Sequence, residues 1–537
     1  MPSRRILPAS VLVFALLAAL STLPVALAPI PALADYPNHL ARMYVLSRDG
    51  TAAAHPHYQV AWAFYPNLAM DLLVPWMARL TGVEAAGRLV LLASQALVVS
   101  GAVALEWSVK RRFAFAGFAA LMLLQALPFA WGFLNFQLGL GLALWGLALM
   151  LRLADRGWPV RLAAHAGATI VLAACHLVAL GVYGFALALL ELHRTASGRS
   201  RSVETLARLA LLAAPAAGIG ALLWAFGDGV GRPGTTWVWS MKPFWPLLAL
   251  NGFDRVASCL GTAVLVVTVA VLARRGALRL LPGGGWIAAG FALLYVAMPT
   301  TLLATAFIDV RVVVAAALIL PAFVVASPAA GRLRVLAPAA AALVAALNLG
   351  VAVSLQLSYR GEYDAMLDSF GAIERGARVL IGHSGEGDDP PLSDLSEYPI
   401  HHAPTLAVHY ADAFVPTLFT SPGKQPLRAA PPHRHLDLPD GGLAPAALLA
   451  AVARGQVADA PAAIRDWPRD YAYLYLVGPR RPNPLPDLLE ELASGSRFVL
   501  YRVRTLSPDG AQAGLTAIPP ASGRSPAPAP ASRPGGP

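Results

Sequence analysis

Long apolar segments separated by short connections constrain the fold of this 537-residue chain more than any other feature. About eleven segments are long enough to cross a bilayer, which takes roughly twenty apolar residues. Hydrophobic residues make up 57% of the chain and charged residues 13%, a balance that excludes an ordinary soluble globular protein. The sequence therefore predicts a polytopic α-helical membrane protein. The predicted segments are 6–28, 86–107, 113–131, 134–151, 160–175, 177–192, 206–226, 256–273, 286–306, 310–326 and 335–357.

The fifth and sixth segments form one apolar stretch from Val160 to Leu192, which is too long for a single crossing. The only polar break in this stretch is His176. We therefore expect two helices that meet at His176.

Positive charge falls on alternate connections, which sets the expected orientation. Connections such as 110–112, 194–208 and 274–279 are rich in Lys and Arg, whereas those near 131–135 and at His176 carry none. Basic residues accumulate on the cytoplasmic side, so the N-terminus is expected inside and the C-terminal region outside the membrane. The net charge of +11 is spread over these loops, so no nucleic-acid partner is expected.

The first segment ends in Ala32-Leu33-Ala34, the small-residue pattern of a signal-peptidase site. Its apolar run is longer than that of a usual signal peptide, which favours an uncleaved anchor. Cleavage stays the alternative and would leave the later topology unchanged.

Composition divides the chain into three parts. Residues 1–357 form the predicted transmembrane domain with a long first outer loop (29–84), and 358–505 form an extracytoplasmic α/β domain. Residues 506–537 are rich in Pro, Ala, Gly and Ser and are expected to be disordered. Within the outer domain we expect strands at 377–381, 472–477 and 498–503 and a helix at 484–493.

The first outer loop holds the most reactive group of side chains. Asp35 precedes Pro37, and the residues that follow are expected to start a helix with Asn38, His39 and Arg42 near one face. A carboxylate, an imidazole and a guanidinium this close can act as base, proton partner and phosphate clamp. The alternative is interfacial polarity alone. Further along, Asp71 is expected to be solvated on an interfacial amphipathic helix.

Three further polar residues lie at the outer ends of spans. His176 needs a hydrogen-bond partner and either caps a helical hairpin or contributes to a site. Asp309 and Arg311 open the tenth segment, where each charge would cost about 2.5–3.5 kcal/mol at mid-bilayer. They snorkel to the membrane surface, pair with each other or face a polar cavity, and Arg311 is the better candidate to bind an anionic lipid phosphate.

The outer connection 227–255 combines aromatic and basic side chains, namely Trp237, Trp239, Lys242 and Arg255. Clustered tryptophans usually anchor a protein at the membrane interface. They also stack on sugar rings, and a nearby Lys or Arg binds phosphate. Both interpretations stay open.

The histidines of the outer domain, including His401, His402 and His433, match no closed metal-ligand spacing, so no metal site is predicted. Nucleotide-phosphate loops are absent as well. Gly139 and Gly141 lie in a membrane helix and are expected to allow close helix contact.

The layout resembles the GT-C superfamily of integral membrane glycosyltransferases. The shared features are an N-terminal anchor, a long first outer loop with an acidic residue just after the membrane, many spans and an outer C-terminal domain. Asp35 occupies the place of the catalytic carboxylate in that superfamily. The second acidic residue that is common beside it in relatives is missing here. A divalent cation therefore stays possible, and no other cofactor is implied.

The resemblance implies transfer of a sugar from a polyprenyl-phosphate donor to an envelope glycan, lipid or protein acceptor. The reaction would take place on the extracytoplasmic (periplasmic) side of a bacterial inner (plasma) membrane. In this interpretation Asp35 removes the acceptor proton, His39 tunes Asp35, and Arg42 or Arg311 holds the phosphate. Lys242 or Arg255 adds a phosphate contact, while Trp237 and Trp239 shape the sugar pocket.

Two other classes of protein remain as alternatives. A transporter or flippase for a lipid-linked or small polar substrate would need polar residues at several membrane depths, whereas here they gather at one face. A non-catalytic envelope protein would not need so many spans.

Overall fold

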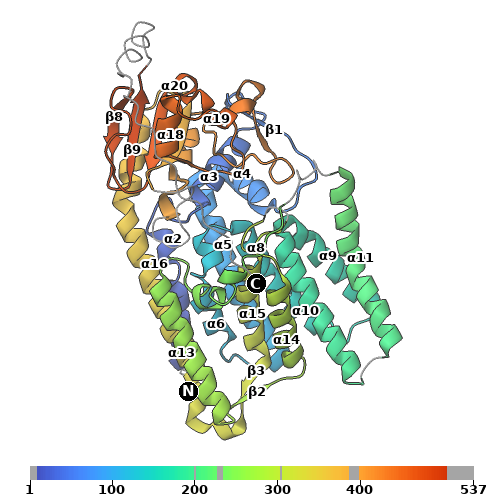
Figure 1. The fold of residues 1–537 in the computed structure, drawn as a ribbon. Coiled ribbons are helices and arrows are strands. Elements are labelled where there is room, and N and C mark those ends of the chain that lie inside the picture. The colour runs from blue at the N-terminus through green and yellow to red at the C-terminus, as the bar shows by residue number, and fades with distance from the viewer. Residues whose placement is uncertain (1–8, 199–200, 227–233, 303–304, 386–397, 505–537) are drawn as a thin grey trace, which may run out of the picture.

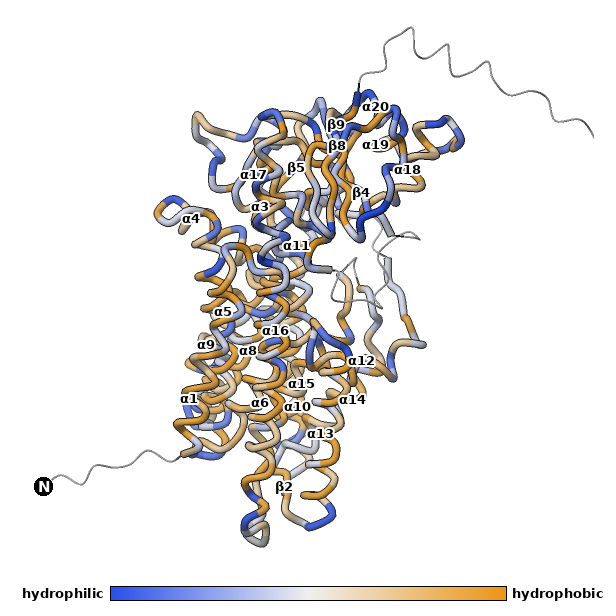
Figure 2. Tube along the Cα trace, turned by 90° about the vertical axis from the view of Figure 1, so that its left-hand side faces the viewer, coloured by the Kyte–Doolittle hydropathy of each residue, from blue (hydrophilic) through white to orange (hydrophobic). Residues whose placement is uncertain are grey.

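The computed structural model describes residues 9–198, 201–226, 234–302, 305–385 and 398–504. A tall bundle of helices carries a smaller domain with a β-sheet at one end (Figure 1). Hydrophobic residues dominate the bundle, and hydrophilic ones are frequent in the domain (Figure 2). The predicted fold class, a polytopic helical membrane protein with a small C-terminal α/β region, is confirmed. The predicted tail, 506–537, lies outside the described residues.

Every predicted apolar segment contains a helix. Over the described residues, eight helices are long and apolar enough to cross a membrane. These comprise α1 (Ala9–Leu20) with α2 (Leu23–Ala26), α5 (Val83–Lys110), α8 (Leu134–Arg152), α9 (Trp158–Cys175), α10 (Leu177–Ala196), α11 (Ser202–Phe226), α13 (Arg255–Arg274) and α16 (Leu336–Ser369). Shorter apolar helices are α6 (Ala116–Leu123) with α7 (Leu127–Ala130), α14 (Gly284–Ala297) and α15 (Ile308–Ile319). The number of spans and their orientation stay predictions.

The break expected at His176 is confirmed. Helix α9 ends at Cys175 and α10 begins at Leu177, while His176 between them is extended, with φ −166° and ψ 127°. The side chain of this residue is buried. A sharp turn at the end of the bundle thus points an imidazole inward.

Helices α5 and α8 pack closely at the centre of the bundle. A Cβ added to Gly101 would lie 2.8 Å from the carbonyl oxygen of Gly141, and one added to Gly141 would lie 2.7 Å from Leu97 Cβ. Only glycine permits this approach of two helix backbones. The expected role of Gly141 in helix contact is confirmed.

Helix α16 connects the bundle to the C-terminal domain. It runs for 34 residues, about 51 Å, and passes residue 357, where the composition changes. Beyond it lies a five-stranded sheet in the order β6-β4-β7-β9-β8. Strands β4 and β7 are parallel, whereas β9 pairs antiparallel with β7 and β8. The strands are β4 (Val379–His383), β6 (Ala444–Pro445), β7 (Tyr473–Val477), β8 (Leu489–Ser494) and β9 (Phe498–Val503), and the helices α18 (Ala446–Ala453), α19 (Ala462–Arg465) and α20 (Trp467–Asp470) lie beside them (Figure 1).

The three predicted strands correspond to β4, β7 and β9, but the helix expected at 484–493 is wrong. This segment contains edge strand β8, which pairs with β9 and has an irregularity between Glu491 and Ala493. Leu, Glu and Ala favour helix, but that preference is weak. Backbone pairing with the buried strand β9 overrides it.

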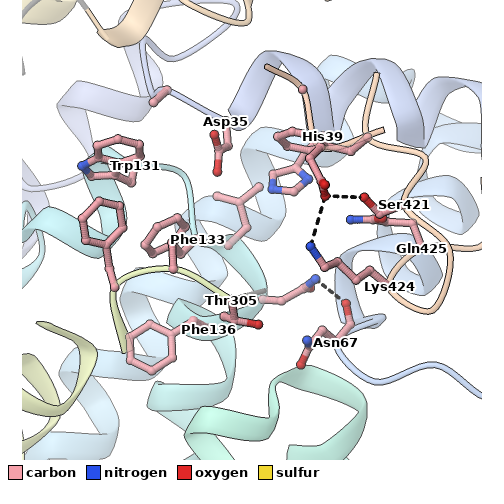
Figure 3. A pocket seen from close by; sticks show the side chains of 18 of the residues that line it. Asp35, His39, Asn67, Trp131, Phe133, Phe136, Thr305, Ser421, Lys424 and Gln425 are labelled. Atoms are coloured by element: carbon pink, nitrogen blue, oxygen red, sulfur yellow. Dashed lines mark hydrogen bonds and ion pairs between the residues drawn. The ribbon is translucent and has the colours of Figure 1, made fainter. Parts of the chain in front are cut away.

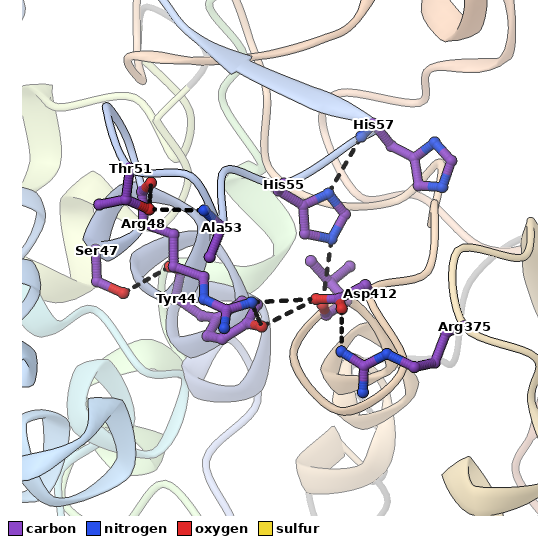
Figure 4. Close-up of polar contacts among 10 residues, drawn as sticks. Tyr44, Ser47, Arg48, Thr51, Ala53, His55, His57, Arg375 and Asp412 are labelled. Atoms are coloured by element: carbon purple, nitrogen blue, oxygen red, sulfur yellow. Dashed lines mark hydrogen bonds and ion pairs between the residues drawn. The ribbon is translucent and has the colours of Figure 1, made fainter.

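The first outer loop packs against the C-terminal domain and forms one body with it. The loop contains α3 (Tyr36–Ser47), α4 (Ala69–Thr81) and β1 (Tyr58–Val60), and β1 pairs antiparallel with β5 (Leu427–Ala429). A polar cluster adds to this contact (Figure 4). Asp412 accepts a hydrogen bond of 2.9 Å from the Tyr44 hydroxyl and forms ion pairs with Arg48 and Arg375. The helix that follows Asp35 is thus held between the bundle and the domain.

Candidate active site

A cavity of about 930 Å³ lies between the end of the bundle and the C-terminal domain. Its bundle wall is partly aromatic and its domain wall is polar (Figure 3). The bundle wall includes Trp131, Phe133, Leu134, Phe136, His176, Phe307 and Arg311, together with Asp35, His39 and Arg42 from the first outer loop. The domain wall consists of His401, His402, Phe419, Ser421, Lys424, Gln425, Pro439, Asp440, Gly441 and Gly442.

Backbone contacts with the loop after α7 fix the position of Asp35. The amides of Ala34 and Asp35 donate hydrogen bonds of 3.0 Å to the carbonyls of Ala130 and Trp131. Gly132, with φ +82°, lies so close that an added Cβ would be 3.1 Å from the Asp35 nitrogen. Asp35 precedes α3, but its side chain does not cap this helix. The carboxylate therefore faces the cavity.

Burial changes the acid–base behaviour of Asp35. Desolvation raises its pKa from 3.8 to about 7, against the opposing charges of Arg311 and Arg42. The side chain is 18% exposed, so the cavity still reaches it. A carboxylate that titrates near neutral pH is suited to general base catalysis.

Neutral imidazoles line the same cavity as Asp35. His402 Nε2 lies 3.6 Å from Asp35 Oδ1. Burial holds the pKa of His402 and of His39 well below the usual value, so both rings are uncharged at neutral pH. In each ring Nδ1 has no hydrogen-bond partner among the described residues. These rings supply dipoles around the carboxylate without adding charge.

The two arginines of the cavity differ in their partners. Arg42 forms a two-pronged ion pair with Asp71, with Nε–Oδ1 at 2.7 Å and Nη2–Oδ2 at 3.1 Å. Both side chains are buried, so the expectation that Asp71 is solvated is wrong. A buried carboxylate on α4 is stable here because a guanidinium on α3 neutralises it. The Nη1 of Arg42 has no partner among the described residues.

Arg311 is buried without such a carboxylate. Its Nη1 donates to His176 Nε2 at 2.9 Å, and its Nη2 donates to the Ala306 carbonyl at 3.1 Å. The guanidinium lies 4.0 Å from the centre of the Phe133 ring. Within the described part of the chain it has no ion pair, and its Nε has no hydrogen bond. A buried cation with only neutral partners favours the binding of an anion beside it.

Asn38, a predicted site residue, lies outside the cavity lining. Its side chain is fully buried: Nδ2 donates to the Thr417 carbonyl at 2.8 Å, and Oδ1 accepts from the Phe419 amide at 2.9 Å. These two bonds attach α3 to the domain wall. Asn38 thus holds Phe419 in place rather than facing the cavity.

Five other predicted residues do not line the cavity either. Lys242 is buried, and its Nζ lies 3.2 Å from Asp309 Oδ2 and donates to the carbonyls of Tyr295 and Met298. Trp237 and Trp239 are exposed, and Arg255 is an exposed residue at the start of α13. The structure therefore brings together Asp35, His39, Arg42, His176 and Arg311, but not Trp237, Trp239, Lys242, Arg255 or Asp309.

Sequence reasoning did not identify the domain wall. Lys424 Nζ and Ser421 Oγ both donate to Asp440 Oδ1, at 3.2 and 2.6 Å (Figure 3). Gly441, with φ +81°, permits close packing, since an added Cβ would lie 2.6 Å from the Phe419 ring and 3.1 Å from His402 Cε1. The signal for this wall in the sequence is the pair His401-His402, and neighbouring histidines suggest metal ligands before they suggest the wall of a cavity.

Among the described residues, no group of three or more His, Cys, Asp or Glu side chains is arranged to hold a metal ion. Among the described residues that line the cavity, the acidic ones are Asp35 and Asp440, and Asp35 is followed in sequence by Tyr36 rather than by a second carboxylate. No ligand set for a cation is assigned.

Comparison with solved structures found two that are similar to this chain, both of the same protein. No protein-family model and no curated protein matches the chain. The crystal structures of ArnT from Cupriavidus metallidurans, bound to undecaprenyl phosphate and in the apo state, are 14% identical to it. Each match covers 91% of this chain and 97% of ArnT, with TM-scores of 0.44 and 0.46. At this identity and TM-score the two matches are a similarity only, and no role of a residue is taken from them.

Proposed function

We propose that this protein transfers a sugar from a polyprenyl-phosphate donor to an envelope acceptor at the extracytoplasmic face of the membrane. One observation carries the proposal: a single cavity holds a carboxylate whose pKa is near 7 and a buried guanidinium without an ion pair among the described residues. The first is suited to accept a proton, and the second is suited to bind a phosphate.

The reaction balances with these two groups. The acceptor oxygen attacks the anomeric carbon of the sugar, and the bond from this carbon to the phosphate oxygen breaks. The electron pair leaves with the polyprenyl phosphate, and the acceptor proton passes to Asp35. Negative charge therefore grows on the phosphate. Arg311 would stabilise it together with Arg42 Nη1, which has no partner among the described residues.

The aromatic side chains of the bundle wall suit the sugar. Trp131 lies 4.9 Å from Phe307, and Phe133 lies 6.2 Å from each, measured between ring centres. Such rings stack on the apolar faces of sugars and exclude water from the reacting carbon. The polar domain wall across the cavity would then contact the acceptor. Trp237, Trp239, Lys242 and Arg255 have no role in this proposal.

The test is a substitution in a deletion strain, with lipid-linked sugars and envelope glycans followed by mass spectrometry. The deletion should accumulate a lipid-linked donor and lose one envelope modification, and the unaltered protein should restore both. Asp35→Asn should restore neither, although the protein is inserted at normal levels.

A matched control is Asp49→Asn, because Asp49 is an exposed carboxylate just beyond α3. This variant should restore the modification fully. Restoration by Asp35→Asn would remove Asp35 from catalysis. A deletion with unchanged glycans and lipid-linked sugars would reject sugar transfer altogether.

A further inference from the structure

A second group of arginines lies at the end of the bundle opposite the cavity. Arg161 of α9, Arg194 of α10 and Arg208 of α11 surround Glu191, at N–O distances of 3.1, 3.6 and 3.6 Å. Glu191 is 15 residues from His176 along α10, which places this group about 22 Å from the cavity end of that helix. It is therefore separate from the candidate active site.

The charges in this group do not cancel. Three guanidinium groups face one carboxylate, which leaves two positive charges in excess. Arg201 and Glu204, near the start of α11, have opposite signs and do not change this excess. Glu191 and Arg161 are both buried, so water screens the excess only through the partly exposed Arg194 and Arg208. An anion at this position would be stabilised.

Hydrogen-bond donors in the group are free to receive that anion. Arg161 is 7% exposed, and its Nε has no hydrogen-bond partner within the described part of the chain. The same holds for Trp158 Nε1, whose ring lies 5.0 Å from the Arg161 guanidinium. Arg208 Nη1 makes no hydrogen bond there either, but it forms the 3.6 Å ion pair with Glu191 Oε2. Buried N–H groups are normally paired. Two donors without a partner among the described residues, beside excess positive charge, fit the oxygens of a phosphate.

The surroundings indicate a lipid as the source of the phosphate. Helix α11 lies at the edge of the bundle (Figure 1), and Thr205 is the one buried residue recorded for it. Its apolar side chains, such as Leu206 and Leu211, are exposed beside the arginines. Acyl chains can therefore lie along α11 while the headgroup contacts Arg208. Basic pockets between the ends of membrane helices bind anionic headgroups in this way.

We propose that the ends of α9, α10 and α11 form a binding site for the phosphate of an anionic phospholipid, and that this lipid holds α11 to the bundle. The site does not depend on the proposed sugar transfer.

The test measures binding of phosphatidylglycerol to the purified full-length protein by native mass spectrometry, and its effect on thermal unfolding. The double variant Arg194→Gln/Arg208→Gln keeps the Arg161–Glu191 pair and should bind this lipid about 10- to 100-fold more weakly, since each charge-assisted contact is worth up to about tenfold. The single variant Arg208→Gln should lose less of its affinity for phosphatidylglycerol. It replaces the double variant in the test if the double variant does not fold.

The matched control is Arg274→Gln/Arg275→Gln, which removes two exposed arginines at the end of α13. This control variant should bind phosphatidylglycerol like the unaltered protein. Phosphatidylcholine should not raise the unfolding temperature of the control variant or of the unaltered protein. Equal binding by both double variants would overturn the site. If inorganic phosphate alone raised the unfolding temperature as much as phosphatidylglycerol does, the assignment to a lipid would be overturned.

Discussion

The two walls of the cavity use charge differently. On the bundle wall, Arg311 is buried, contacts neutral partners and has no ion pair among the described residues. On the domain wall, Lys424 lies 3.2 Å from Asp440, and the Asp440 side chain is 77% exposed. An exposed pair contributes little binding energy, whereas a desolvated cation interacts strongly with any anion that reaches it. The bundle wall is thus suited to chemistry, and the domain wall to adaptable contacts with an acceptor.

Within the bundle wall, Arg42 and Arg311 also differ in whether a carboxylate neutralises them. Both are buried, but Asp71 neutralises Arg42 through two hydrogen bonds, while Arg311 contacts His176 and a carbonyl. The Arg42 pair is therefore expected to hold α3 against α4. Arg311 is expected to hold substrate. A carboxylate partner, rather than burial, thus decides how much of the charge of an arginine is left for the substrate. The charge of Arg311 is not compensated by a close ion pair among the described residues, whereas Arg42 offers only its Nη1.

The largest effect on stability is expected from Asp71→Asn. It leaves the Arg42 guanidinium buried without its counter-charge, and breaking a buried ion pair in this way costs about 3–5 kcal/mol of unfolding free energy. Asp440→Asn breaks the exposed pair with Lys424 and should cost less than about 1 kcal/mol. Thermal or denaturant unfolding in detergent measures both. Equal costs would mean that the two pairs are not distinguished by burial.

The next largest effect is expected from Arg311→Gln. Glutamine keeps a hydrogen-bond donor but removes the charge that faces the developing phosphate anion, so kcat/KM should fall by about 10²–10³. Stability should fall less than in Asp71→Asn, by about 1–3 kcal/mol, because the substitution breaks the hydrogen bonds to His176 and the Ala306 carbonyl but no close ion pair among the described residues. Donor consumption by purified protein measures the rate, and Arg275→Gln on the exposed end of α13 is the control. Unchanged kcat/KM in Arg311→Gln would place the phosphate elsewhere.

Local patterns in the sequence are sufficient to predict the helices of the bundle. Hydrophobic length predicts the helices, the break at His176 follows from one polar residue in an apolar run, and Pro37 indicates the start of α3. The strands β4, β7 and β9 follow from their β-branched and aromatic residues. These features depend on neighbours within a few positions along the chain, which is why a single sequence reveals them.

The domain wall depends on contacts that have no local pattern. His402 reaches Asp35 because β1 pairs with β5 and because Asn38 bonds Thr417 and Phe419, across more than 300 positions of sequence. The partner of Asp71 is 29 residues away, so its burial was not apparent either. In β8 the residue preferences favour helix, and pairing with β9 decides against it. Each failure comes from a tertiary contact that overrides or escapes local preference.

The smallest predicted effect tests whether the domain wall also takes part in the chemistry. In the unaltered protein, transfer should rise with pH through about 7, because Asp35 must lose its proton before it can act as a base. His402 places a neutral, polar ring 3.6 Å from that carboxylate. Replacing it with leucine makes the surroundings less polar and should raise the pKa of Asp35 further, by roughly half to one unit.

The pH profile of His402→Leu should therefore move to higher pH, with near-normal rates once Asp35 is ionised. His402→Gln restores an amide near the same position and should move the profile less. Infrared titration of the Asp35 carboxyl, assigned by subtraction of Asp35→Asn spectra, measures the same shift without any turnover. A purely structural His402 would give a lower rate at every pH and an unmoved carboxyl titration. In that case the domain wall would shape the cavity, and the bundle side alone would set the acidity of its base.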